Sequence, residues 1–320
     1  IFEYLLLALL LVPINYMFLS TINVLSIVDN VLLLFSLFVI EELLLLKYIR
    51  KPTIRILIIS WVMVLLVIFS LLNDYIMLAD SVLGYSSIIG ARYYGLGNEY
   101  MGFFLGAFIL VLTISLEIAI SKQYKINLIM VIFPFLVIAF FIGSGNLGAN
   151  FGGMLTALTA GGIVCYYILK DKRWINKLTI CSLILSFLII VIYLDYSGLM
   201  GSSSHIGQAF HKLMDHKWQW LLDIIFRKIS MNLKLLRWTI WTRVLLVMIV
   251  YLFILLKKPV PGLKYIFENN HYFKAGLYGA LAGSIVTMFV NDSGVVAAAT
   301  IFFYPVMGLL YFLHYNKPEE

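Results

Sequence analysis

Charged residues are scarce in this chain. Of its 320 residues, 12% are Asp, Glu, Lys or Arg, and 62% are hydrophobic. This composition excludes a soluble globular protein, because no soluble domain buries so much apolar surface. Runs of about 20 apolar residues match a hydrocarbon layer about 30 Å thick and predict a polytopic helical membrane protein. The runs are too long and too uniformly apolar for the strands of a membrane β-barrel.

Cysteine is nearly absent as well. Cys165 and Cys181 both fall inside predicted spans, and we interpret them as apolar filler and not as a disulfide or metal pair. No signal peptide is evident, because the chain begins with Ile1 and enters an apolar run at once. The missing initiator Met leads us to expect a trimmed chain or a piece of a longer protein.

We predict an all-α fold, a polytopic transmembrane bundle of about ten spans that makes residues 1–320 a single integral membrane domain. The Gly-x-x-x-Gly pairs Gly102/Gly106 and Gly148/Gly152 predict close helix packing. The predicted spans are Phe2–Ser20, Val24–Leu46, Ile54–Leu72, Asn98–Ile120, Asn127–Ile142, Asn150–Leu169, Leu178–Leu194, Thr239–Leu256, Ala275–Val290 and Val295–His314.

The positive charges alternate from loop to loop. Basic loops follow the second, fourth, sixth and eighth spans, whereas the intervening short loops hold one basic residue, Arg92. The positive-inside rule therefore places both termini in the cytoplasm, and we expect a multi-pass protein of the bacterial cytoplasmic membrane. The net charge of +7 points to anionic membrane lipids as partners and not to nucleic acid.

Residues 195–238 depart from this pattern, because they carry six Lys or Arg on the predicted outer side. Either the span count is wrong nearby, or these cations have an extracytoplasmic role. Within the segment, residues 218–238 place apolar side chains on one broad helical face, which predicts an amphipathic helix in the membrane interface between the seventh and eighth spans. A plain interfacial anchor and a substrate-binding helix both fit this pattern.

Four polar motifs lie at span ends or in the adjoining loops, and charge counting places all of them on the outer side. They are Gly90–Gly102 (GARYYGLGNEYMG), Gly143–Gly153 (GSGNLGANFGG), Ser202–Phe210 (SSSHIGQAF) and Asn291–Gly294 (NDSG). Their convergence on one side predicts an extracytoplasmic site.

The first motif has the densest set of polar groups. Arg92 can hold a phosphate with two parallel hydrogen bonds, and Glu99 can pair with it or act as a base. Asn98 lies where a helix begins, so free backbone N–H groups are available there for an anion. The alternative is an Arg92–Glu99 structural pair with close packing at the glycines. The glycine spacing fits neither a Walker A loop nor a Rossmann fingerprint.

The second and fourth motifs offer further polar groups. Asn146 and Asn150 are candidate substrate-binding amides, and a tight turn with small-residue packing is the alternative. Asn291 and Ser293 are candidate binding residues in the turn between the last two spans. Asp292 is either a cap for the helix at Val295 or Val296, or a base that meets substrate.

His205 is the histidine that we select as a proton carrier, because Gly and Ser residues flank it and the outer motifs surround it. His211 and His216 follow at spacings of six and five, which is not the helical spacing of a zinc pair. We therefore predict no metal site and no cofactor.

The ten spans, the inward termini and the long external segment before the eighth span resemble the lipid-linked glycan polymerases and ligases. These are the SEDS peptidoglycan polymerases and the O-antigen ligases and polymerases. The stretch Arg92–Asn98 (RYYGLGN) is similar to the Arg…Gly…Asn stretch of O-antigen ligases, and His205 lies where a ligase His is expected. The SEDS signature segments are absent, and the motif set suggests a separate bacterial family.

The resemblance implies glycosyl transfer from an undecaprenyl-pyrophosphate sugar without a metal. We expect Arg92, with Arg227 or Arg237, to hold the pyrophosphate, and Glu99, Asp292 or His205 to deprotonate the acceptor hydroxyl. A transporter or flippase for an anionic or lipid-linked substrate is a second hypothesis, since glycine-broken helices are common in transporters. A non-catalytic partner in envelope assembly is the third.

Overall fold

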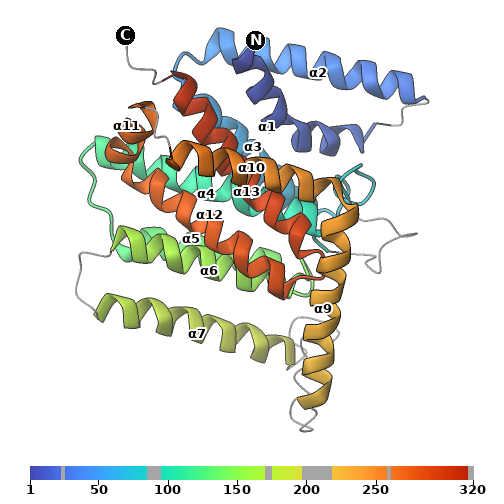
Figure 1. Cartoon of the computed structure of the whole chain (residues 1–320), viewed down its shortest axis with the longest axis vertical. Coiled ribbons are helices and arrows are strands. Elements are labelled where there is room, and N and C mark those ends of the chain that lie inside the picture. The colour runs from blue at the N-terminus through green and yellow to red at the C-terminus, as the bar shows by residue number, and fades with distance from the viewer. Residues whose placement is uncertain (23–25, 85–94, 170–174, 197–217, 258–260, 316–320) are drawn as a thin grey trace.

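The computed structural model describes residues 1–22, 26–84, 95–169, 175–196, 218–257 and 261–315, and within these ranges the chain forms twelve helices and no strand (Figure 1). The expected all-α class is confirmed for this part of the chain. The helices are α1 (Phe2–Leu19), α2 (Ile27–Tyr48), α3 (Pro52–Leu72), α4 (Asn98–Ser121), α5 (Leu128–Gly143), α6 (Phe151–Ile168), α7 (Ile175–Tyr196), α9 (Trp218–Trp238), α10 (Ile240–Lys257), α11 (Pro261–Asn269), α12 (His271–Val290) and α13 (Gly294–Tyr315).

Each predicted span coincides with one of these helices, with small differences at the ends. Seven helices, namely α1, α3, α4, α6, α10, α12 and α13, are long and apolar enough to cross a membrane. Helix α5 is a shorter apolar helix, and α2 carries Asp29, Glu41, Glu42 and Lys47 along its length. Length and composition therefore support membrane-spanning helices, and the total of ten spans stays a prediction. The sequence did not predict α11, which lies in a loop we expected between the eighth and ninth spans.

Side chains at the helix starts explain several of the boundaries. Ser26 accepts a hydrogen bond from the backbone N–H of Asp29 at 3.1 Å, and Asn127 accepts one from Met130 at 2.9 Å. These caps satisfy N–H groups that have no partner in the first turn of α2 and α5. Pro52 begins α3, where its missing N–H costs no helix bond.

Helices α4 and α13 form the centre of the bundle. All residues of 100–114 in α4 and of 294–309 in α13 are buried. A Cβ on Gly102 would overlap the Thr300 side chain, and one on Gly106 would overlap the backbone of Ile301. The glycine pair predicted from sequence thus lets two backbones pack directly against each other.

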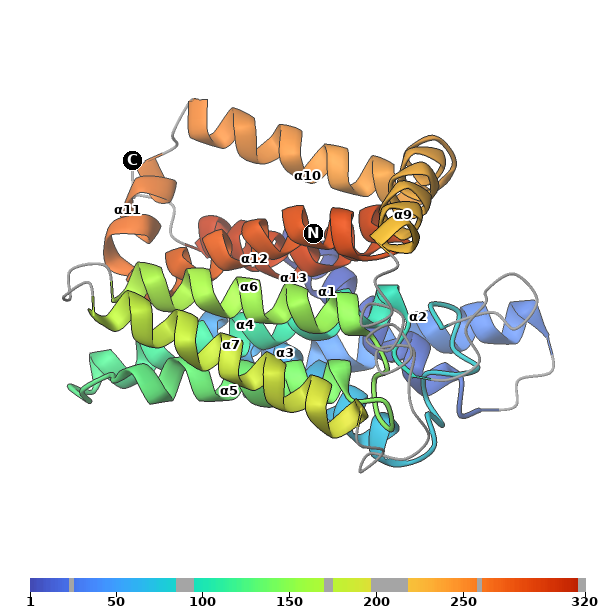
Figure 2. The same cartoon turned by 90° about the horizontal axis from the view of Figure 1, so that it is seen from below.

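The long helices of the bundle run side by side, whereas α9 crosses one end of the bundle (Figures 1 and 2). In Figure 2, α9 is viewed nearly along its own axis. It contacts α10, α12 and α13, near the turn where α12 gives way to α13. We call this the α9 end. The opposite end holds α11 and the last turn of α13 (Figure 1).

A buried ion pair closes the opposite end. Arg55 of α3 lies 2.6 Å from the Glu3 carboxylate of α1, and both side chains are largely buried. The Arg55 guanidinium also donates to the Tyr311 and Tyr315 hydroxyls of α13 at 3.1 and 2.8 Å, and to the Ile49 carbonyl at 2.6 Å. Three helices that are far apart in sequence are joined in this way.

Replacing Arg55 by Met should lower the free energy of unfolding by roughly 3–5 kcal/mol, because Glu3 would stay buried without its counter-charge. The double change Arg55→Met, Glu3→Gln should recover much of this loss. The matched control is Lys264→Met, which removes the exposed Lys264–Glu268 pair at 3.9 Å and should change little. Thermal unfolding in detergent measures the stability of all three variants. Equal losses of stability in Arg55→Met and Lys264→Met would refute a stabilising role for the buried Arg55–Glu3 pair.

Candidate functional site

Three of the four polar motifs have described residues, and these residues lie together at the α9 end. They come from the start of α4, the turn between α5 and α6, and the turn between α12 and α13. The contacts between them are direct, as set out below. Arg92 and His205, the two residues on which the predicted chemistry most depends, lie outside the described residues.

Asn150 is the polar centre of the contact between the start of α4 and the start of α6. Its side-chain nitrogen donates to the Leu96 carbonyl at 3.2 Å and to the Asn98 side-chain oxygen at 3.0 Å. Its side-chain oxygen accepts from the Gly153 N–H at 2.8 Å and so caps α6. With 1% of its surface exposed, Asn150 is enclosed by these partners. Two predicted binding residues, Asn98 and Asn150, therefore hold the starts of α4 and α6 together.

The backbone reinforces this contact. The Leu96 N–H donates to the Gly148 carbonyl at 2.7 Å, immediately before α4 begins. Gly95 has a φ of 85°, a conformation that side-chain-bearing residues rarely adopt, and a Cβ there would lie 2.6 Å from the Gly148 carbonyl oxygen. Glycine at this position thus permits both the turn and the close approach of the two loops.

The turn between α12 and α13 adjoins the same region. Asn291 is buried, and its side chain donates to the Thr287 hydroxyl at 2.7 Å. A Cβ on Gly152 would overlap the Asn291 side-chain oxygen, so α6 touches this turn through a glycine. The second predicted glycine pair, Gly148 and Gly152, therefore contributes to close packing at this end as the first pair does in the bundle centre.

Helix α9 is fastened to this turn by two residues that the sequence analysis did not single out. The Asn232 side chain donates to the Asn291 carbonyl at 2.9 Å and accepts from the Val295 N–H at 3.0 Å. Lys228 donates to the Val290 carbonyl. One helix thus satisfies the last carbonyls of α12 and the first turn of α13, and the Lys228 charge lies at the negative end of the α12 dipole.

A sequence signal for these two residues did exist. Lys228 and Asn232 are four residues apart, so they share one side of α9, and that side is otherwise apolar. Polar groups within an apolar helix face predict a specific polar partner, because they would be costly to bury alone. The partner itself is set by the tertiary structure.

The remaining predicted residues have more solvent access. Asn146 and Asp292 are exposed, and Glu99 and Ser293 are partly exposed. The Val295 N–H, one of two amides that we expected Asp292 to cap, donates to Asn232 instead. These exposed groups could meet a ligand, whereas the side chains of Asn150 and Asn291 already bind helix ends.

Arg227 and Arg237 are exposed on α9. Each is five residues from Asn232, which places both about 140° around the helix from it. They therefore point away from the face that binds the α12–α13 turn. Their joint role with Arg92 stays a prediction. Among the residues that the structure describes, no three His, Cys, Asp or Glu side chains come close enough together to hold a metal ion.

Comparison with protein-family models, curated proteins and solved structures finds no match for this chain.

Asn150 and Asn146 belong to the same motif, so replacing each compares a buried asparagine that bonds helix ends with an exposed one. Replacing Asn150 by Ala should cost about 1–3 kcal/mol of stability, because the Gly153 N–H and the Leu96 carbonyl would lose a buried partner. Replacing the exposed Asn146 by Ala should leave stability within about 0.5 kcal/mol of the wild type. Detergent melting curves measure both, and equal loss in the two variants would contradict the arrangement around Asn150.

Proposed function

We propose that the protein binds an anionic, lipid-linked substrate at the α9 end and transfers a glycan from it. One observation supports this above all: polar helix ends and a crosswise helix bearing exposed arginines gather at a single end of a bundle of membrane-length apolar helices. Ionisable groups near membrane depth usually have a function, because they are costly to place there.

The proposed location is the outer face of the bacterial cytoplasmic membrane. The described helix ends next to the basic loops, namely the ends of α2, α4, α6 and α10, lie opposite α9, as the helix order requires. The positive-inside rule assigns that end to the cytoplasm and the α9 end to the exterior. In this orientation α9 would lie in the outer membrane interface, with its exposed arginines near lipid headgroups.

The proposed chemistry is a displacement at the anomeric carbon of a polyprenyl-pyrophosphate sugar. The acceptor hydroxyl oxygen forms the new bond to that carbon, and the bond to the pyrophosphate oxygen breaks with its electron pair. Glu99, Asp292 or His205 takes the hydroxyl proton. Arg92, with Arg227 or Arg237, stabilises the charge on the departing polyprenyl pyrophosphate. Asn146 and Ser293 are the polar groups proposed to orient the sugar, because the side chains of Asn98 and Asn291 already bond within the protein.

A transporter fits the described part of the chain less well. Transporter sites form near the bilayer midplane, where helices are broken. Here the described polar motifs lie at helix ends, and the central helices α4 and α13 run through the middle without a break.

The functional test combines lipid analysis with variants of Arg92. A strain that lacks the protein should accumulate undecaprenyl-linked glycan intermediates, and the wild-type gene should reverse this. Arg92→Ala should be folded but inactive, and Arg92→Lys should restore activity only in part, because Lys lacks the planar pair of donors. Arg50→Ala, an exposed change at the opposite end, is the control and should complement fully.

If Arg92 only pairs with Glu99, Arg92→Ala should instead lose folded protein, and the double change Arg92→Ala, Glu99→Ala should recover it. A stable Arg92→Ala protein that complements fully would remove the main anion-binding group from the proposal.

A further inference from the structure

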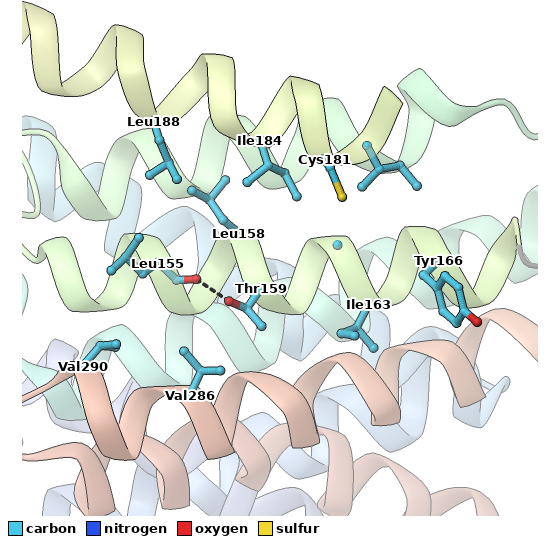
Figure 3. A pocket seen from close by; sticks show the side chains of 12 residues that line it. Leu155, Leu158, Thr159, Ile163, Tyr166, Cys181, Ile184, Leu188, Val286 and Val290 are labelled. Carbon is cyan, nitrogen blue, oxygen red and sulfur yellow. Dashed lines mark hydrogen bonds between the residues drawn. The ribbon is translucent and has the colours of Figure 1, made fainter. Parts of the chain in front are cut away.

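An apolar groove of about 530 Å³ runs along α6, between α7 and α12. Figure 3 shows Cys181, Ile184 and Leu188 of α7 facing α6, with Val286 and Val290 of α12 on the other side. Helix α7 contacts α5 and α6, and the groove occupies the space between α7 and α12. Among the residues that the structure describes, those that line the groove carry no charge.

The chemistry of the lining selects a hydrocarbon ligand. Thr159 is the one hydroxyl-bearing residue midway along the groove, and its oxygen donates to the Leu155 carbonyl at 2.8 Å. A polar ligand would lose its hydrogen bonds to water here and find few in return. A hydrocarbon chain loses nothing and gains close contacts with the branched side chains.

The groove has a direction and a length. It extends from Leu155 to Tyr166 along α6, which at about 1.5 Å per residue is roughly 16 Å. That is about half of a hydrocarbon layer about 30 Å thick, and it covers the middle of α6. Leu155 and Val290 mark the end of the groove that reaches the α9 end.

A positive charge adjoins that end of the groove. Lys228 of α9 donates to the carbonyl of Val290, and the Val290 side chain lines the groove. A chain lying in the groove would therefore have its head near a lysine, at the bundle end where the polar motifs gather. A neutral or cationic headgroup would gain less from this position than an anionic one.

We infer that this groove binds the polyprenyl chain of the lipid-linked substrate and places its phosphate at the α9 end. This inference rests on the proposed function for the identity of the lipid, and on the groove and Lys228 for its position. The chain lies along the groove, and the phosphate lies beside α9.

Cys181 provides a direct measurement, because it is exposed and lines the groove, whereas Cys165 is buried and serves as an internal control. Protein in phosphatidylcholine nanodiscs is treated with a membrane-permeant maleimide, with and without undecaprenyl phosphate. Saturating undecaprenyl phosphate should slow Cys181 labelling about tenfold, a change that corresponds to about 1.4 kcal/mol. Phosphatidylglycerol at the same concentration should slow it less than about twofold.

Gly162 supplies a variant that fills the groove. An added Cβ at this position meets only the end of the Ile184 side chain, at 3.3 Å, so a larger residue projects into the groove without striking backbone. Gly162→Leu should weaken binding of undecaprenyl phosphate about tenfold or more, since it removes space for the chain. Gly162→Ala should change binding little, as should Leu185→Phe, which enlarges an exposed residue of α7 outside the groove. Melting curves of the variants confirm that each is folded.

The outcomes separate the groove from the proposed function. Equal protection of Cys181 by undecaprenol and undecaprenyl phosphate, lost in Gly162→Leu, would support the groove and count against an anionic substrate. No protection by either compound would overturn the groove, while the Arg92 variants would still test the function. Equal protection by phosphatidylglycerol would show general lipid contact and overturn the inference. So would a second protein cross-linked at Cys181 in native membranes.

Discussion

Helix ends that lie away from water need hydrogen-bond partners, and this constraint organises the protein. In an apolar environment, an N–H or carbonyl group without a partner costs free energy that a bundle of this kind cannot recover elsewhere. Neighbouring helices supply the partners here. Asn150 bridges the starts of α4 and α6, Asn232 joins the end of α12 to the start of α13, and the Glu117 carboxylate of α4 accepts from the Tyr272 N–H at the start of α12.

The same bonds place the candidate site. Lys228 and Asn232 bind one face of α9 to the turn between α12 and α13. The opposite face, which carries Arg227 and Arg237, is therefore exposed. Because Asn150 and Asn291 are committed to helix ends, the polar groups with access to a ligand are Asn146, Asp292, Glu99 and Ser293. The apolar groove along α6 ends beside this set, which gives an amphiphilic ligand one place for its chain and another for its head.

Much of the fold follows from the sequence, since long apolar runs have few alternatives in a membrane. The helices at 98–121 and 294–315 were predicted within a few residues, and so was the helix at 218–238. Its interfacial position stays a prediction. Helix α11 was missed because its nine residues are fewer than the window over which a helical period is read, although the helix is amphipathic. The close packing at Gly102 and Gly106 was predicted correctly, because small residues four positions apart on a helix let a neighbouring backbone approach closely.

The site was less predictable. Sequence indicated that Asn98, Asn150 and Asn291 belong to one end, and the structure brings them there. It could not indicate whether their amides serve a ligand or a helix end, because that depends on neighbours distant in the chain. Their contacts are those of the structural alternative, and their binding of substrate stays a prediction. Asn232 was missed for the same reason: its partners are 59 and 63 positions away.

Hydrogen exchange of the α12–α13 turn tests the organising role of these bonds most directly. Asn232→Leu keeps the size of the side chain but cannot bond to Asn291 or Val295, and Ser230→Ala changes an exposed position of the same helix. We predict that residues 291–297 exchange about tenfold faster or more in Asn232→Leu, while exchange near Arg55 stays unchanged. In Ser230→Ala, residues 291–297 should exchange at the wild-type rate. Unchanged exchange at residues 291–297 in Asn232→Leu would contradict the account.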